Sequence, residues 1–254
     1  MITIRRSSTS KANPQIKEVA AKKKEGNQAW LKRVGASDGL ILLGGASITH
    51  FRIRVAQSHA RGDLKPSLWS LAGLLTGGDS FLSTPLELCD QGSQIALRNG
   101  VKRCRLEDYD NPDEFPNVAV IQFTADATMI LENASRIADQ RSMIDLPALM
   151  LPWLSYIWIA GKATNPLSEG LGLPSAAFVE TAYGIAGIEL TPGLSSATSC
   201  PEAIWQAAKW WHAFYVDAAT TTHAENAMPQ NPAGSFVTRQ PVAGATWPPD
   251  KSRS

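Results

Sequence analysis

Side chains that most often carry chemistry are few in this chain, and their spacing excludes several kinds of site. The histidines and cysteines are His50, His59, His212, His223, Cys89, Cys104 and Cys200. Their spacing is not that of zinc ligands, and three cysteines without a CxxC pair do not indicate a disulfide framework. Neither a phosphate-binding P-loop nor a GxGxxG motif after a predicted strand occurs. The sequence therefore predicts no metal and no cofactor.

The apolar pattern predicts the elements that must position any site. Short apolar runs bounded by Gly, Pro or Asp predict strands over 39–43, 69–75, 81–88 and 118–123. Apolar residues at helical spacing predict helices around Phe51 and over 127–140, 146–160 and 175–186. A last helix is expected to have Ser199 as its N-cap and Glu202 in a capping box. We therefore expect an α+β fold, with a small antiparallel sheet packed against helices.

Charge is distributed unevenly along a chain whose formal net charge is only +1. Residues 1–35 contain nine Lys or Arg and two Glu, whereas the remainder contains 15 basic and 21 acidic residues. We expect residues 1–37 to form a basic N-terminal arm with a helix from Pro14 to Arg33, either packed through its few apolar residues or docked on an acidic protein partner. Nucleic acid is not expected as a partner, because aromatic residues are not interleaved with the basic ones.

The ends of the chain and one apolar run bear on its setting. Residues 217–254 have little periodicity and predict an irregular C-terminal tail that also contacts a protein partner. The run 143–161 has the length of a membrane span but contains Asp145, Pro147 and Pro152, so we expect a buried helical segment there. No apolar segment follows the N-terminal charges, and an unpaired cysteine suits a reducing compartment, so a cytoplasmic location is expected.

Five segments carry a family resemblance through their order: PSLWSLAGLLTGG, FLSTPLEL, NGVKRCRLEDY, FPNVAVIQF and LPSAAFVETAYGIAGIELTP. Residues 38–216 thereby resemble the circularly permuted branch of the NlpC-type papain-like superfamily, which includes the lecithin retinol acyltransferase relatives. In that family a strand reading S-H-x-G-I supplies a histidine, and the next strand supplies a polar or acidic residue. A helix opening C-S-x-x-V supplies the nucleophile. The resemblance implies a permuted papain-like α+β domain.

The residues at the family's catalytic positions differ from the family's own. The resemblance puts Leu71 at the histidine position, Glu87 at the polar position and Ser175 at the cysteine position. A cysteine at a helix N-terminus is activated because the helix dipole and a neighbouring imidazolium lower its pKa. A serine there keeps a very high pKa and needs a base within hydrogen-bond reach, which Leu71 cannot provide. The remaining candidate bases are His59 and Glu87.

Each of these residues also has a structural explanation. Ser175 could serve only as a helix N-cap, Glu87 as an exposed or ion-paired strand residue, and His59 as a surface residue. We therefore expect a catalytically degenerate member of the superfamily that acts as a binding or assembly subunit. Two alternatives remain open: an active intracellular hydrolase or acyltransferase that uses Ser175 on an amide or ester, and a protein-interaction subunit of a larger complex.

Overall fold

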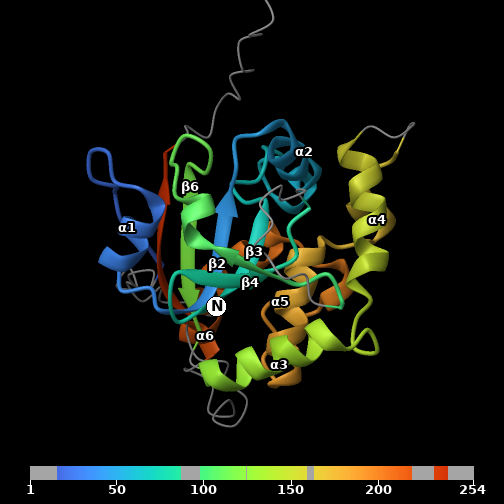
Figure 1. The fold of residues 1–254 in the computed structure, drawn as a ribbon. Coiled ribbons are helices and arrows are strands. Elements are labelled where there is room, and N and C mark those ends of the chain that lie inside the picture. The colour runs from blue at the N-terminus through green and yellow to red at the C-terminus, as the bar shows by residue number, and fades with distance from the viewer. Residues whose placement is uncertain (1–15, 87–97, 124, 159–162, 219–231, 240–254) are drawn as a thin grey trace, which may run out of the picture.

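One mixed sheet, covered by helices on both faces, organises the described part of the chain (Figure 1). The computed structural model describes residues 16–86, 98–123, 125–158, 163–218 and 232–239. The strands are β1 (Ile16–Glu18), β2 (Asp38–Gly44), β3 (Leu71–Thr76), β4 (Ser80–Ser83), β5 (Lys102–Arg105), β6 (Asn117–Gln122) and β7 (Ala233–Thr238). They lie in the order β1-β7-β6-β2-β3-β4-β5, and every pair is antiparallel except β1 with β7.

The helices divide unequally between the two faces of the sheet. They are α1 (Asn27–Arg33), α2 (Ile48–Ala56), α3 (Ala127–Asp139), α4 (Leu146–Ile157), α5 (Pro174–Ile185) and α6 (Pro201–Ala218). Alternate residues of β2 enter two separate cores, because successive side chains of a strand point to opposite faces. Helices α2 to α6 contribute to the core that contains Leu40 and Leu42, whereas α1 contributes Trp30 and Leu31 to the core that contains Ile41 and Leu43.

The predicted α+β class is confirmed, and several predicted elements are observed within a few residues. Strands β2, β3 and β6 and helices α3, α4 and α5 correspond to the predicted runs. Strand β4 ends at Ser83, earlier than predicted, and residues 87–88 of the predicted strand lie outside the described residues. Helix α4 buries Leu146, Leu149, Trp153 and Ile157. Within the described ranges, no helix is long and apolar enough to cross a membrane.

The N-terminal segment differs from the predicted helical arm. Residues 16–18 form β1, which pairs in parallel with residues 234–236 of β7, and the helix comprises only Asn27–Arg33. The helix begins where it does because Asp110 Oδ1 accepts a hydrogen bond from the Gln28 N–H at 2.6 Å, although 82 residues separate the two. Gly26 permits this approach, since a Cβ there would lie 2.5 Å from the Asp110 carboxylate. The described part of the predicted arm is therefore an integral part of the fold.

The C-terminal prediction also needs correction. Residues 233–238, expected in an irregular tail, form β7 between β6 and β1. The strand contains a glycine for a packing reason, because a Cβ at Gly234 would lie 2.1 Å from the Val120 carbonyl oxygen. The boundaries expected near residues 37 and 217 therefore do not separate structural units, because strands from beyond both of them complete one sheet.

The start of α6 is built differently from the predicted capping box. The helix begins at Pro201, and the Ile204 N–H donates to the Cys200 carbonyl oxygen. Ser199 is not the N-cap, because its hydroxyl donates to Glu180 Oε1 at 2.8 Å. The Glu202 carboxylate is likewise occupied elsewhere, as described below. Both side chains join α6 to other elements instead of closing its own first turn.

Candidate functional site

Ser175 occupies the second position of α5, inside the protein. The helix begins at Pro174 with Leu173 as its N-cap, so the predicted N-cap role of Ser175 is wrong. Only 1% of the residue is exposed. Its Oγ accepts a hydrogen bond from the Ala72 N–H of β3 at 3.3 Å. The structure thus brings the predicted nucleophile helix beside the predicted histidine strand, through a backbone contact.

This hydrogen bond has a clear structural cause in the sheet. The paired residues of β3 and β4 are Leu74 with Leu82 and Leu75 with Phe81, and the pairing does not extend to Ala72. The Ala72 peptide groups on that side are satisfied by side chains instead, because its N–H donates to Ser175 and its carbonyl accepts from Ser83 Oγ at 2.6 Å. Two serines thus replace strand pairing where a buried peptide group would otherwise lose its partners.

Leu71 does not face Ser175. Its side chain packs with Trp30 and Leu31 on one face of the sheet, whereas Ala72 faces the core to which α5 contributes Ala176. A side chain at position 71 therefore points away from α5, and position 72 is the one that faces it. The expected adjacency of this strand and this helix is observed, but position 71, where the histidine was expected, lies on the opposite face of the strand.

Of the two predicted bases, only His59 lies within the described residues. His59 is exposed on the 3₁₀ turn Ser58–Ala60 that follows α2. Glu87 lies outside the described residues. Among the described residues, no histidine or carboxylate is hydrogen-bonded to the Ser175 hydroxyl. Within the described ranges, the one hydrogen bond of the Ser175 hydroxyl is therefore to a backbone N–H, which cannot act as a base.

A buried carboxylate lies farther along the same helix. Glu180 is 5% exposed, and its Oε1 accepts hydrogen bonds from Thr191 Oγ1 at 2.5 Å and Ser199 Oγ at 2.8 Å. Burial raises the pKa of the Glu180 carboxyl above its ordinary value, although the two hydroxyl donors oppose the shift. Its partners connect α5 with the start of α6, so we assign it a structural role.

Replacement of Glu180 by Gln is expected to change how stability depends on pH. Burial raises the pKa of the Glu180 carboxyl in the folded state above its pKa in the unfolded state. Stability is therefore lost as pH rises from the unfolded-state pKa through the folded-state pKa, because the carboxyl must then ionise while buried. Gln keeps an oxygen for both hydroxyl donors and carries no charge. Urea midpoints of Glu180→Gln and the wild type should nearly coincide at about pH 4 and separate at about pH 8, with the variant more stable. Glu132→Gln, at an exposed residue of α3, should show no such divergence.

A second buried carboxylate, Glu202, anchors α6 to the region after α2. It is fully buried, and it accepts hydrogen bonds from Ser67 Oγ at 2.6 Å and Gln206 Nε2 at 2.5 Å. Arg61 Nη1 lies 3.8 Å from Glu202 Oε1, and the Glu202 N–H donates to Gln57 Oε1. Sequence reasoning missed this cluster because its members are up to 145 residues apart.

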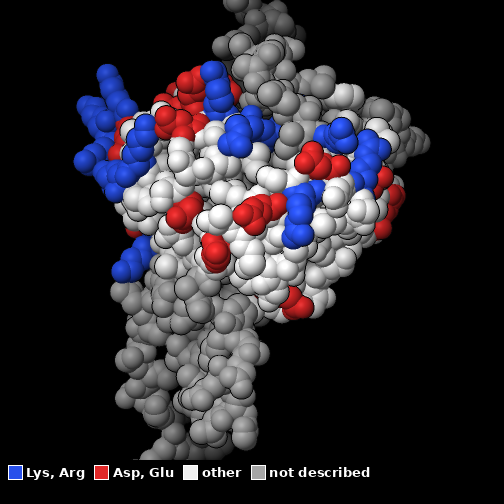
Figure 2. Space-filling model, turned by 60° about the horizontal axis from the view of Figure 1, so that its bottom comes forward, with Lys and Arg blue, Asp and Glu red and all other residues white. Residues whose placement is uncertain are grey.

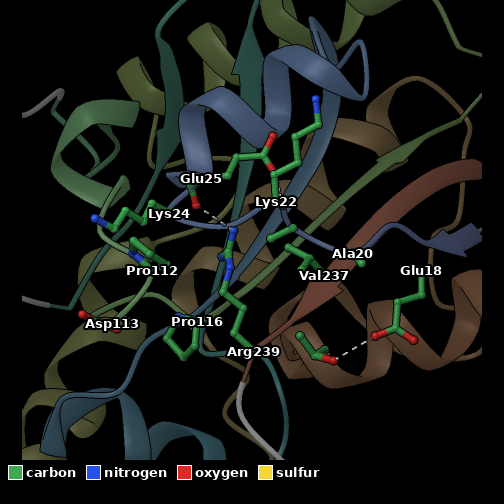
Figure 3. Close-up of a pocket in the computed structure, with 12 residues that line it drawn as sticks. Glu18, Ala20, Lys22, Lys24, Glu25, Pro112, Asp113, Pro116, Val237 and Arg239 are labelled. Carbon is green, nitrogen blue, oxygen red and sulfur yellow. Dashed lines mark hydrogen bonds between the residues drawn. The ribbon is translucent and has the colours of Figure 1, made fainter.

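A cavity of about 530 Å³ lies between residues 18–25, residues 112–116 and the end of β7 (Figure 3). The segment that forms one wall is firmly held, since the Val19 N–H donates to the Phe236 carbonyl and Trp30 Nε1 donates to the Val19 carbonyl. Lys22, Lys23 and Lys24 of this segment are exposed. Figure 2 shows basic side chains gathered at one margin of the molecule, with acidic side chains beside them. The cavity is therefore lined both by the basic segment near the N-terminus and by the end of β7.

Three cations, Lys22, Lys24 and Arg239, and three carboxylates, Glu18, Glu25 and Asp113, line the cavity, without direct ion pairs among these described side chains. Arg239 is half-buried, and its guanidinium donates to Asn27 Oδ1 at 2.5 Å and the Glu25 carbonyl at 3.4 Å. Among the described carboxylates, none forms an ion pair with Arg239, Lys22 or Lys24. Glu25 instead binds Arg33 through both oxygens, which with the Lys22 N–H lowers the Glu25 pKa to about 2. Arg239 therefore interacts with the carboxylates of Glu25 and Asp110 only through space, which leaves its guanidinium without a direct carboxylate contact among the described residues.

The basic composition of the N-terminal residues was the sequence signal for this site. Nothing in the sequence indicated Arg239, because this residue lies in the predicted irregular tail. Within the described ranges, no group of three His, Cys, Asp or Glu residues could hold a metal ion. Comparison of the chain with family models, curated proteins and solved structures gives no match. The resemblance to the papain-like superfamily therefore rests on the residues quoted for it.

Proposed function

We propose that this chain is a catalytically inactive relative of the permuted papain-like proteins and binds an acidic segment of a partner protein. The binding site is the cavity between residues 18–25 and β7. The observation that carries the binding proposal is Arg239, a half-buried guanidinium that lines a cavity and has no ion pair with a described carboxylate. Arginine binds carboxylates through two parallel hydrogen bonds, so this position suits an Asp or Glu side chain.

The surroundings of Arg239 favour a peptide over a small anion. Lys22 and Lys24 extend from the opposite wall, on the exposed segment that leads to α1 (Figure 3). They can interact with further carboxylates along an extended chain, which would run past the cavity's own carboxylates, Glu18, Glu25 and Asp113. Pro112, Pro116 and Val237 supply apolar contacts between the charged groups. The chemistry is that of an acidic segment with interspersed apolar residues.

The proposal of inactivity rests on the geometry of Ser175. Its hydroxyl is buried, accepts the Ala72 N–H and has no hydrogen bond to a described base. Because Ser175 is only 1% exposed, a substrate carbonyl has no access to its hydroxyl. In this proposal the position that carries the nucleophile in the resembled family has become a link between α5 and β3.

A fluorophosphonate probe is expected to leave Ser175 unlabelled, because the hydroxyl is neither accessible nor deprotonated. Ser175→Ala should lower the free energy of unfolding by about 1–2 kcal/mol, since the buried Ala72 N–H loses its acceptor. Ser83→Ala is the matched control, because it removes the hydroxyl that donates to the carbonyl oxygen of the same residue, Ala72. Labelling that disappears in Ser175→Ala but persists in Ser83→Ala would show an active serine hydrolase and refute the inactivity.

A fluorescein-labelled oligoglutamate peptide is expected to bind the purified chain, with an affinity that falls as salt rises. The double variant Lys22→Gln/Lys24→Gln should weaken binding by about tenfold in fluorescence anisotropy, which corresponds to two screened ion pairs. Both lysines are exposed, so the fold should be unaffected. Arg239→Gln should weaken binding further.

The control for this experiment removes two positive charges elsewhere, in Lys65→Gln/Lys102→Gln. Equal weakening by the control pair would show that binding is a general charge effect, and absence of binding to the wild type would refute the site directly. An oligolysine peptide of equal length should not bind. The thermal midpoint of each variant shows whether lost affinity comes from the site or from lost structure.

A further inference from the structure

The outer face of α4 is apolar although it faces solvent. Its inner residues, Leu146, Leu149, Trp153 and Ile157, are buried in the core. On the outer side Leu151 is 67% exposed, and Trp158 directly after the helix is 57% exposed. No charged residue occurs between Leu146 and Trp158. Figure 1 shows α4 at the margin of the molecule, with no described helix or strand on its outer side.

The apolar residues of this face follow the spacing of helix-to-helix contacts. Pro147, Leu151, Leu154 and Trp158 are separated by four, three and four residues, and Leu154 is half-buried at the margin of the stripe. Alternation of three and four keeps side chains on one stripe of a helix and permits a second helix to pack along it. We define these four residues as the α4 stripe.

We propose that the α4 stripe is the contact surface of a homodimer, in which the α4 helices of two copies pack antiparallel about a two-fold axis near Leu151. An isologous contact requires that the stripe be complementary to itself. Its N-terminal half has Pro147, with the small, exposed Ala148 beside it, whereas its C-terminal half has Leu154 and Trp158. Antiparallel pairing about Leu151 brings Leu154 level with Ala148 of the other copy and Trp158 level with Ile144, just before the other helix, while parallel pairing would place Trp158 against Trp158.

Charge at the two ends of α4 supports the same arrangement. Asp145 is the exposed N-cap of α4, and Arg52 donates from α2 to the Ile157 carbonyl oxygen at 2.6 Å. Residues 145 and 157 are each six positions from Leu151, so a two-fold axis there brings the Asp145 of one copy level with the Arg52 of the other. Among the described residues, neither side chain has an ion-pair partner within its own chain. In the proposed dimer, Asp145 of each copy pairs with Arg52 of the other, which gives two ion pairs.

The expected dimer is weak, because one helix face is smaller than the roughly 800 Å² per partner of a standard stable interface. The surface also lies apart from the cavity proposed for acidic segments, which is lined by other elements. Dimerisation would therefore present two such cavities in one particle, and it can be tested without knowledge of any other partner.

Sedimentation velocity of the full chain across micromolar concentrations is expected to show a monomer–dimer equilibrium. Leu151→Glu should weaken the dimer by about a hundredfold or more, because it places two charges at the axis. Leu194→Glu, at an exposed leucine outside α4, is the matched control and should leave the equilibrium unchanged. Asp145→Asn, which keeps an oxygen to cap α4, should weaken the dimer by up to about tenfold through loss of two ion pairs.

A disulfide test locates the axis independently. In a Cys89→Ser background, Leu151→Cys should form a disulfide-linked dimer under mild oxidation, whereas Leu194→Cys should not; Cys104 and Cys200 are buried. A wild-type chain that stays monomeric throughout, or a dimer that persists in Leu151→Glu, would refute the proposal. Sedimentation of the monomer with phosphatidylcholine vesicles, abolished by Leu151→Glu, would refute it in favour of a lipid-facing helix.

Discussion

Deletion of residues 1–35 is expected to unfold the protein, although their composition resembles a detachable basic arm. The deletion removes β1 from the sheet and removes α1 from the core on its face. Trp30 is fully buried there beside Leu31, and their loss would expose Leu71, Phe81 and other apolar residues of that core. Circular dichroism and a urea titration of the truncated chain measure the effect directly. A folded truncated chain with an unchanged midpoint would contradict the arrangement of α1 described above.

A single substitution isolates the same contact without removing charge. Trp30→Ala is expected to lower the free energy of unfolding by about 3–5 kcal/mol, since it leaves a large cavity and leaves the Val19 carbonyl without the indole donor. Trp210→Ala is the matched control, because Trp210 is 70% exposed on α6, and it should change stability little. Lys22→Gln/Lys24→Gln should also leave stability unchanged, which separates the structural role of the segment from its proposed binding role.

A second large loss of stability is expected for Glu202→Ala, which should lower the free energy of unfolding by about 3 kcal/mol. The change leaves Ser67 and Gln206 without a carboxylate acceptor and leaves Arg61 without its buried counter-charge. Urea unfolding monitored by tryptophan fluorescence measures the loss. Glu132→Ala, at an exposed residue of α3, is the control and should have little effect.

The cluster around Glu202 can be tested further with a double-mutant cycle. Ser67→Ala combined with Glu202→Ala should destabilise by less than the sum of the two single changes, because both remove the same 2.6 Å hydrogen bond. Additive effects would show that the contact contributes nothing to the link between α6 and the segment after α2.

The candidate catalytic site shows where sequence reasoning reached its limit. The order of segments correctly predicted that the strand near Leu71 and the helix that begins near Ser175 lie together. Which side chain of the strand faces the helix depends on the register of a strand within its sheet, and a shift of one residue reverses every side chain. Only the packing of Leu71 against Trp30 and Leu31 decides that position 71 points away.

Local pattern alone determined β2, β3, β6 and helices α3 to α5, because each has its own apolar periodicity and its own boundaries. The terminal strands, by contrast, are too short or too polar to be stable alone, and they exist because a partner strand satisfies their backbone groups. The start of α1 is likewise set by Asp110, and the start of α6 is tied to Gln57 and Ser67 through Glu202. Contacts across such sequence separations carry no local signal, so only the tertiary structure joined the basic segment, Arg239 and their cavity.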